Sequence, residues 1–125
     1  MSEIFQNDNF IFRRIRFDKY HYTDNSKGAP MNYIAYMLKG RAKIVSKHRT
    51  IKINEGDIFF IPVNLPYESY WYGDNEIEFL SFGFSKIEVK EKLNFKLQVI
   101  DCDGELKNQL LKIPTYSCFV SCVAL

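Results

Sequence analysis

Short runs of alternating apolar and polar side chains recur along the chain from Phe10 onwards, and residues that favour turns separate them. Alternation with a period of two is typical of a β-strand that is buried on one face. The pattern predicts strands at the following positions: 10–17, 19–23, 32–38, 41–46, 50–53, 58–61, 67–72, 77–84 and 95–100. Strands this short and this closely spaced predict an all-β sandwich or barrel.

The stretch 56–71 holds the strongest signals for strand and turn. A Gly-Asp pair precedes the fully apolar run 58–61, and glycine supplies the positive φ that a tight turn needs. Pro62 ends this run, because proline cannot extend a β-ladder. The loop that follows leads into an aromatic strand at 67–72. We therefore expect two consecutive strands that are joined by a short loop.

The sequence changes character after Phe84. Asp103 is predicted to cap a helix, because the apolar residues behind it share one helical face: Leu106, Leu110 and Ile113. No charged residue follows Lys112, and the apolar positions there repeat at helical spacing. We expect a β-barrel domain over residues 1–100 and a short helical linker or dimerisation segment over 101–125, whose natural continuation is missing.

Composition narrows the class of protein. A length of 125 residues predicts one domain with one core, and 46% hydrophobic and 16% aromatic residues fit a β-rich fold. The net charge of +2 is too small to imply that this chain itself binds nucleic acid. Three cysteines without a CxxC pair indicate free thiols in a reducing cytoplasm. Because the N-terminus lacks signal-peptide features and no run reaches the ~20 apolar residues of a membrane span, we expect a cytoplasmic protein without membrane contact.

The spacing of Gly56, Pro62, Asn64 and Tyr67 resembles the second sequence motif of the cupin β-barrels. In that motif the position of Asn64 is usually glycine, and the position of Tyr67 is a metal-binding histidine. The later asparagine of the motif is replaced by Trp71. The resemblance implies a cupin-like double-stranded β-barrel, or jelly roll, that has lost these metal-site residues.

Residues 33–40, Tyr-Ile-Ala-Tyr-Met-Leu-Lys-Gly, resemble the first cupin motif. In the family a glutamate stands seven residues before the glycine, and Tyr33 occupies that place here. The family's His-x-His would fall in the loop 24–30, which contains no histidine. A transition metal needs three or four converging ligands, whereas the chain has only His21 and His48. We therefore expect no metal and no cofactor.

Three segments together are most similar to one branch of the cupins. They are Tyr-x-Leu-x-Gly at 36–40, Ile-x-Ile-x-x-Gly-Asp-Ile-Phe-Phe-Ile-Pro at 51–62, and Phe-Leu-Ser-Phe-Gly-Phe at 79–84. This branch is the N-terminal sensing domain of AraC/XylS-type transcription regulators. The resemblance covers roughly Tyr20 to Phe84. It implies a small-molecule effector such as a sugar or an aromatic metabolite, a homodimer formed through the C-terminal segment, and DNA contact only through helix-turn-helix units that are absent from these 125 residues.

The resemblance also implies which side chains face the barrel lumen. Tyr33, Tyr67 and Trp71 occupy inward-facing motif positions, and strand alternation adds Ala35, Met37 and Ser69. On the strand 77–84 the family's lumen positions fall on Phe79 and Ser81. The candidate ligand-binding residues are therefore His21, Tyr33, Tyr67, Ser69, Trp71, Phe79 and Ser81. The alternative is that these aromatic side chains simply fill a small barrel.

Two other interpretations stay open from the residues themselves. No Ser-His-Asp or Cys-His arrangement is visible, but a small metal-independent cupin enzyme, similar to a sugar isomerase or epimerase, is an alternative function. The basic residues around the hairpin 41–53 fit a solvated sheet face, with a DNA-contacting ribbon as the alternative. Arg14 and Arg16 are candidates for contact with an anionic ligand group, although the pattern does not decide which way they face.

Overall fold

The computed structural model describes residues 3–6, 10–85 and 96–100. The described residues form strands and no helix, in this order: β1 (Glu3–Gln6), β2 (Phe10–Phe17), β3 (Tyr20–Asn25), β4 (Asn32–Lys39), β5 (Arg41–Ser46), β6 (Thr50–Ile53), β7 (Ile58–Ile61), β8 (Tyr67–Tyr72), β9 (Ile77–Phe84) and β10 (Gln98–Ile100). The helix expected after residue 100 lies outside the described residues.

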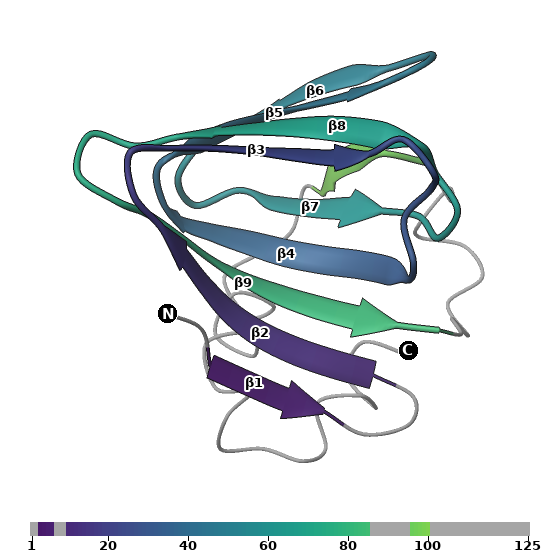
Figure 1. Cartoon of the computed structure of the whole chain (residues 1–125), viewed down its shortest axis with the longest axis horizontal. Coiled ribbons are helices and arrows are strands. Elements are labelled where there is room, and N and C mark those ends of the chain that lie inside the picture. The colour runs from purple at the N-terminus through teal and green to yellow at the C-terminus, as the bar shows by residue number, and fades with distance from the viewer. Residues whose placement is uncertain (1–2, 7–9, 86–95, 101–125) are drawn as a thin grey trace.

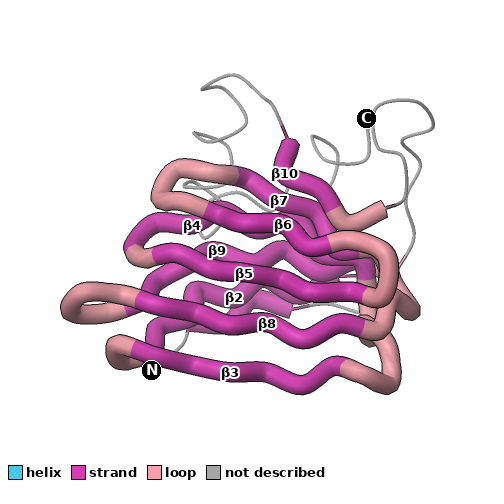
Figure 2. Tube along the Cα trace, turned by 90° about the horizontal axis from the view of Figure 1, so that it is seen from above, coloured by secondary structure: helices cyan, strands magenta, loops and turns pink. Residues whose placement is uncertain are grey.

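The strands form two antiparallel sheets that face each other (Figure 1). The larger sheet has the order β1-β2-β9-β4-β7-β10, and the smaller sheet has the order β3-β8-β5-β6, which Figure 2 shows side by side. From β2 to β9 the chain changes sheet at every connection except the β5–β6 hairpin. The predicted all-β, cupin-like jelly roll is therefore confirmed.

Several boundaries differ from the sequence-based expectation: β10 begins at Gln98 instead of 95, and β3 begins at Tyr20 instead of Lys19. β3 runs on to Asn25, where a loop is expected, because it pairs with β8 along its whole length and Asn25 lies opposite Tyr67. This pairing overrides the turn preference of Asp and Asn. β4 includes Lys39, and β1, which pairs with β2, has no counterpart in the prediction.

The connection between β7 and β8 is fixed by its backbone. Asn64 has a φ of 70°, in the left-handed region where glycine is favoured, and this explains why cupin motifs carry glycine there. The Asn64 amide donates to the Ala29 carbonyl at 2.8 Å. The buried Asn32 side chain accepts a bond from the Val63 amide at 2.9 Å. These two bonds hold the β7–β8 connection against the start of β4 and the residues before it.

Apolar side chains pack on both faces of the larger sheet, and β9 is buried along its full length. The lumen core lies between the two sheets and includes Met37, Ile44, Phe59, Trp71 and Phe79. A second cluster lies on the outer face of the larger sheet and includes Phe12, Ile34, Phe60 and Phe82. Alternation along each strand separates the two clusters. The lumen core surrounds the candidate site.

Candidate functional site

A cavity of about 320 Å³ lies between the two sheets. It is lined from both sheets, and six of the seven candidate residues contribute to its wall: Tyr33, Tyr67, Ser69, Trp71, Phe79 and Ser81. Ala35 also lines the cavity, whereas Met37 belongs to the lumen core but is not part of the cavity wall. The predicted inward direction of these side chains is therefore confirmed. Their role in binding remains a prediction.

The floor of the cavity is a stacked aromatic pair. The rings of Trp71 and Phe79 lie 4.2 Å apart between centroids and are tilted by only 10°. The ring centroids of Phe59 and Trp71 lie 6.1 Å apart. The indole N–H of Trp71 donates to the Ser69 hydroxyl at 2.9 Å, so the buried N–H is satisfied and the ring is held in one orientation. This arrangement leaves a flat apolar surface exposed to the cavity.

Polar groups gather around another part of the wall. Tyr33, Thr23 and Asn25 are half-buried, and Tyr67 is almost fully buried. Burial raises the pKa of Tyr67 to about 12, with a further contribution from Tyr33. Burial also raises the pKa of Tyr33, and the positive charge of Arg13 partly opposes this effect. Both phenols are therefore neutral at physiological pH and able to donate hydrogen bonds.

Arg13 is the charged residue among the cavity-lining residues that the sequence reasoning missed, and Thr23 and Asn25 are polar ones. Arg13 lines the cavity from β2, opposite Ser81 of β9, and its side chain is exposed. Alternation could have found it, because Arg13 lies two residues before Ile15 and four before Phe17, which also line the cavity. Within the described part of the chain, no hydrogen bond or ion pair involves its guanidinium.

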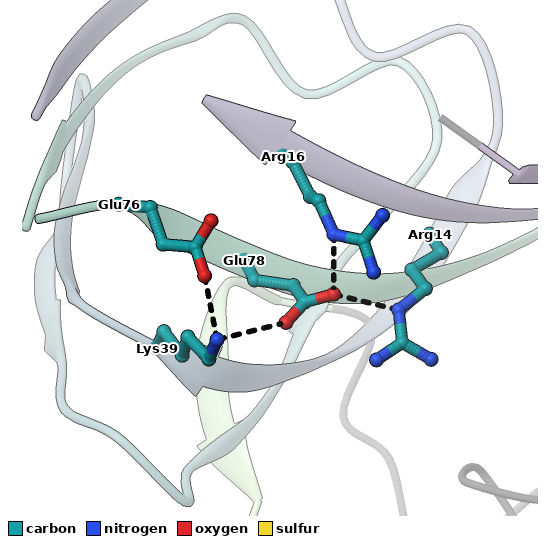
Figure 3. Close-up of polar contacts among 5 residues, drawn as sticks. All are labelled: Arg14, Arg16, Lys39, Glu76 and Glu78. Atoms are coloured by element: carbon teal, nitrogen blue, oxygen red, sulfur yellow. Dashed lines mark hydrogen bonds and ion pairs between the residues drawn. The ribbon is translucent and has the colours of Figure 1, made fainter. Parts of the chain in front are cut away.

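Arg14 and Arg16 face away from the cavity and bind a buried carboxylate (Figure 3). Their Nε atoms donate to Glu78 Oε2 at 2.6 and 2.8 Å. Lys39 pairs with Glu76 and lies 3.9 Å from the second oxygen of Glu78. Burial by itself would raise the pKa of Glu78, but the hydrogen bonds and charges of the two arginines lower it below the usual value. These arginines are therefore not available to a ligand in the lumen.

His21 is the one candidate residue that does not line the cavity. Its ring stacks on Phe17, with centroids 3.6 Å apart and an interplanar angle of 6°. Burial lowers the pKa of His21, so its neutral form is favoured. Phe17 borders both the cavity and a neighbouring polar hollow in which His21 lies. A role of His21 in ligand binding stays a prediction.

The acidic and metal-binding side chains of the described residues do not form a metal centre. No group of three His, Cys, Asp or Glu residues is close enough together there to hold an ion. The two motif positions that correspond to ligands carry Tyr33 and Tyr67, whose phenols are neutral. In the same described ranges, no helix is long and apolar enough to cross a membrane.

The two facing sheets and the lumen cavity define a cupin-type barrel, and solved structures share this fold. A cupin superfamily protein from Desulfitobacterium hafniense matches with a TM-score of 0.57 and 15% identity over 69% of this chain and 77% of its own. ToxT from Vibrio cholerae, bound to an unsaturated fatty acid, matches with a TM-score of 0.66 and 17% identity over 92% of this chain and 49% of its own. The chain thus spans about half the length of ToxT.

A second ToxT structure, bound to (E)-4-(8-methylnaphthalen-1-yl)but-3-enoic acid, matches with a TM-score of 0.65 and 17% identity over 86% of this chain and 48% of its own. The sequence profile of the AraC-like ligand binding domain matches residues 11–112, and the chain belongs to this family. A comparison with functionally curated proteins finds no match.

Proposed function

We propose that the chain is the small-molecule sensing domain of an AraC-type transcription regulator and that the lumen cavity binds the effector. The observation that carries this proposal is the cavity of about 320 Å³, which combines an aromatic floor with several hydrogen-bonding groups. Small-molecule sites are typically concave and mostly apolar, with a few polar groups that orient the ligand. Membership of the AraC-like ligand binding domain family supports the same function.

Each wall of the cavity has a separate role in this proposal. Trp71 and Phe79 would stack against the apolar part of the effector, and the indole is held in place by Ser69. The hydroxyls of Tyr33, Tyr67 and Ser81 would form hydrogen bonds with its polar part. ToxT has been solved with a fatty acid and with an arylbutenoic acid, both of which combine an apolar body with a polar end. These ligands support an amphipathic effector here.

The proposed mechanism is a shift of population between two states of the regulator. An effector that contacts both sheets favours the barrel conformation in which those contacts form. Residues 101–125 follow β10 and would transmit this preference to a homodimer contact or to a DNA-binding part beyond them. Coupling of this kind is typically about 1–3 kcal/mol. We place this regulator in the cytoplasm, where it would reach DNA only through that further part.

A sugar isomerase or epimerase is less well supported by the same cavity. Such chemistry needs a base that removes a proton next to a carbonyl, usually a carboxylate or an imidazole. Among the described residues that line the cavity there is no Asp, Glu or His. The phenols of Tyr33 and Tyr67 are held neutral by their raised pKa values. Binding without chemical conversion therefore agrees better with the residues present.

A thermal-shift screen of small metabolites, followed by titration of Trp71 fluorescence, tests the proposed function. A ligand at 100 times its Kd should stabilise the protein by about 2.7 kcal/mol and change the emission of Trp71. Ser81→Leu places a larger side chain in the cavity and should abolish this response. Thr50→Leu makes the same change on the exposed β6 and should leave the response intact. Equal binding by wild type and Ser81→Leu would exclude the lumen as the site.

A further inference from the structure

We infer that the cavity selects a ligand with a single negative charge, a small monocarboxylic acid with an apolar body, and that Arg13 is the residue that recognises its carboxylate. This inference rests on the proposed function, because it assumes that the lumen binds the effector. It adds the chemical class of that effector and a specificity-determining residue.

The position of Arg13 is set by the register of the larger sheet. On β2 it alternates with Ile15 and Phe17, which pack against the lumen core, while its neighbours Phe12 and Arg14 face outward. Its backbone lies opposite Ser81, which is itself part of the cavity wall. Arg13 therefore stands on a rigid paired strand and does not depend on a loop for its position.

The charge of Arg13 is not balanced by any described neighbour. Arg14 and Arg16 share Glu78, and Lys39 is paired with Glu76. By contrast, no Asp or Glu belongs to the described lining of the cavity, and Arg13 forms no ion pair in that part of the chain. A positive charge at the cavity wall attracts an anion, and water reduces this attraction because the Arg13 side chain is exposed. The electrostatic complement of this cavity is therefore one negative charge.

Neutral donors stand close to this positive charge. The positive charge of Arg13 acts to lower the pKa of the Tyr33 phenol, and the Tyr33 phenol contributes to the raised pKa of Tyr67. All three residues line the same cavity. A carboxylate has two oxygens with several lone pairs, so it can accept the paired N–H groups of a guanidinium and a phenol hydrogen bond at the same time. Because arginine binds carboxylates in a planar, bidentate geometry, lysine would not be equivalent here.

The remainder of the cavity limits the body of the ligand. The stacked rings of Trp71 and Phe79 make this part of the wall apolar, and the hydrogen bond from the indole N–H to Ser69 is internal to the protein. An apolar ring or alkyl chain can pack against this surface and needs no polar partner there. A volume of about 320 Å³ lies at the low end for small-molecule sites, so the body is a single ring system or a short chain.

Binding of 4-phenylbutyrate and of its uncharged amide to the full chain tests this inference. We expect the acid to bind at least ~10-fold more tightly than the amide, measured by calorimetry and by Trp71 fluorescence. Arg13→Gln should remove this preference while the amide binds as before, and Arg13→Lys should retain part of it. Arg41→Gln removes the same charge from an exposed position of β5 and should leave the preference unchanged.

The outcomes separate this inference from the proposed function. Equal affinity for acid and amide, or an unchanged preference in Arg13→Gln, would overturn the selection for a negative charge. The proposal that the lumen binds the effector would remain. Failure of both probes to bind, with an uncharged metabolite binding in the screen, would also overturn the selection for a negative charge. If no compound changes Trp71 emission, the proposed function falls and this inference falls with it. Far-UV circular dichroism of Arg13→Gln shows whether the variant is folded.

Discussion

The carboxylate of Glu78 lies at the rim of the second apolar cluster and receives hydrogen bonds from two arginines. Its side chain is only 4% exposed, whereas those of Arg14 and Arg16 are 33% and 41% exposed. Burial alone would raise the pKa of the Glu78 carboxyl, but the arginines lower it below its ordinary value of 4.5. A carboxyl with a lowered pKa in the folded state contributes stability above the pKa of the unfolded state. This contribution disappears as the pH falls through the folded-state pKa.

Replacing Glu78 by Gln should therefore destabilise the protein by about 1–3 kcal/mol at pH 7, less than for a fully buried pair because the arginines are partly in water. The difference between wild type and Glu78→Gln should shrink steadily below pH 4.5. Urea unfolding at several pH values measures both effects. Glu76→Gln is the matched control, because Glu76 is exposed and its pair with Lys39 should be worth less than about 1 kcal/mol. If the difference in free energy of unfolding between wild type and Glu78→Gln did not change with pH, the lowered pKa of Glu78 would not be the cause.

For single residues, the sequence could predict the direction of a side chain where motif spacing determines it. The motif spacing placed Tyr33 and Trp71 in the lumen, and both line the cavity. The partners of Arg16 could not be predicted, because they depend on a register that brings it opposite Glu78 from a strand more than 60 residues away. Arg13 was missed for another reason: a charged side chain on a lumen face conflicts with the expectation that this face is apolar.

At the scale of the elements, the β7–β8 connection decides where Tyr67 and Trp71 begin their strand. Asn64 adopts a φ of 70°, which costs about 1–2 kcal/mol for most residues, least for Gly and Asn. We predict that Asn64→Gly keeps the free energy of unfolding within about 0.5 kcal/mol of wild type. Asn64→Val should lose about 1–2 kcal/mol, because a β-branched side chain is strained in this conformation. Equal urea midpoints for the two variants would show that the loop is not fixed in this way.

The strands themselves followed from alternation in most places. Nearly every strand from β2 to β9 begins or ends within a residue or two of its expected position, because turn residues mark the ends and one face is buried. The difference of two residues at the end of β3 arises from pairing: Asp24 and Asn25 favour turns in isolation but lie opposite Glu68 and Tyr67 of β8. β1 does not alternate, because its apolar residues Ile4 and Phe5 are adjacent, and it forms by pairing with β2.

At the scale of the whole molecule, the resemblance supplied what alternation could not. Short alternating strands predict a sandwich or barrel, but they do not say which strands pair. The spacing around Gly56 and Pro62 selected the cupin arrangement, in which the chain crosses repeatedly between two sheets, and this arrangement is the one observed. The cavity itself follows from that topology, because residues 50 or more apart in sequence, such as Arg13 and Ser81, meet only in the closed barrel. Its volume could not be read from the sequence.

Residues 113–125 lie outside the described residues and contain no charged side chain. Apolar residues recur there at helical spacing: Tyr116, Phe119, Val120 and Val123. A monomer rarely leaves such a stripe uncovered, so we predict that the chain self-associates through it and that ending the chain after Lys112 reduces this association. Light scattering of both forms over a range of concentrations measures the effect. A full-length chain that is a monodisperse monomer at high concentration, with a protease-resistant C-terminus, would mean that the stripe packs on its own barrel.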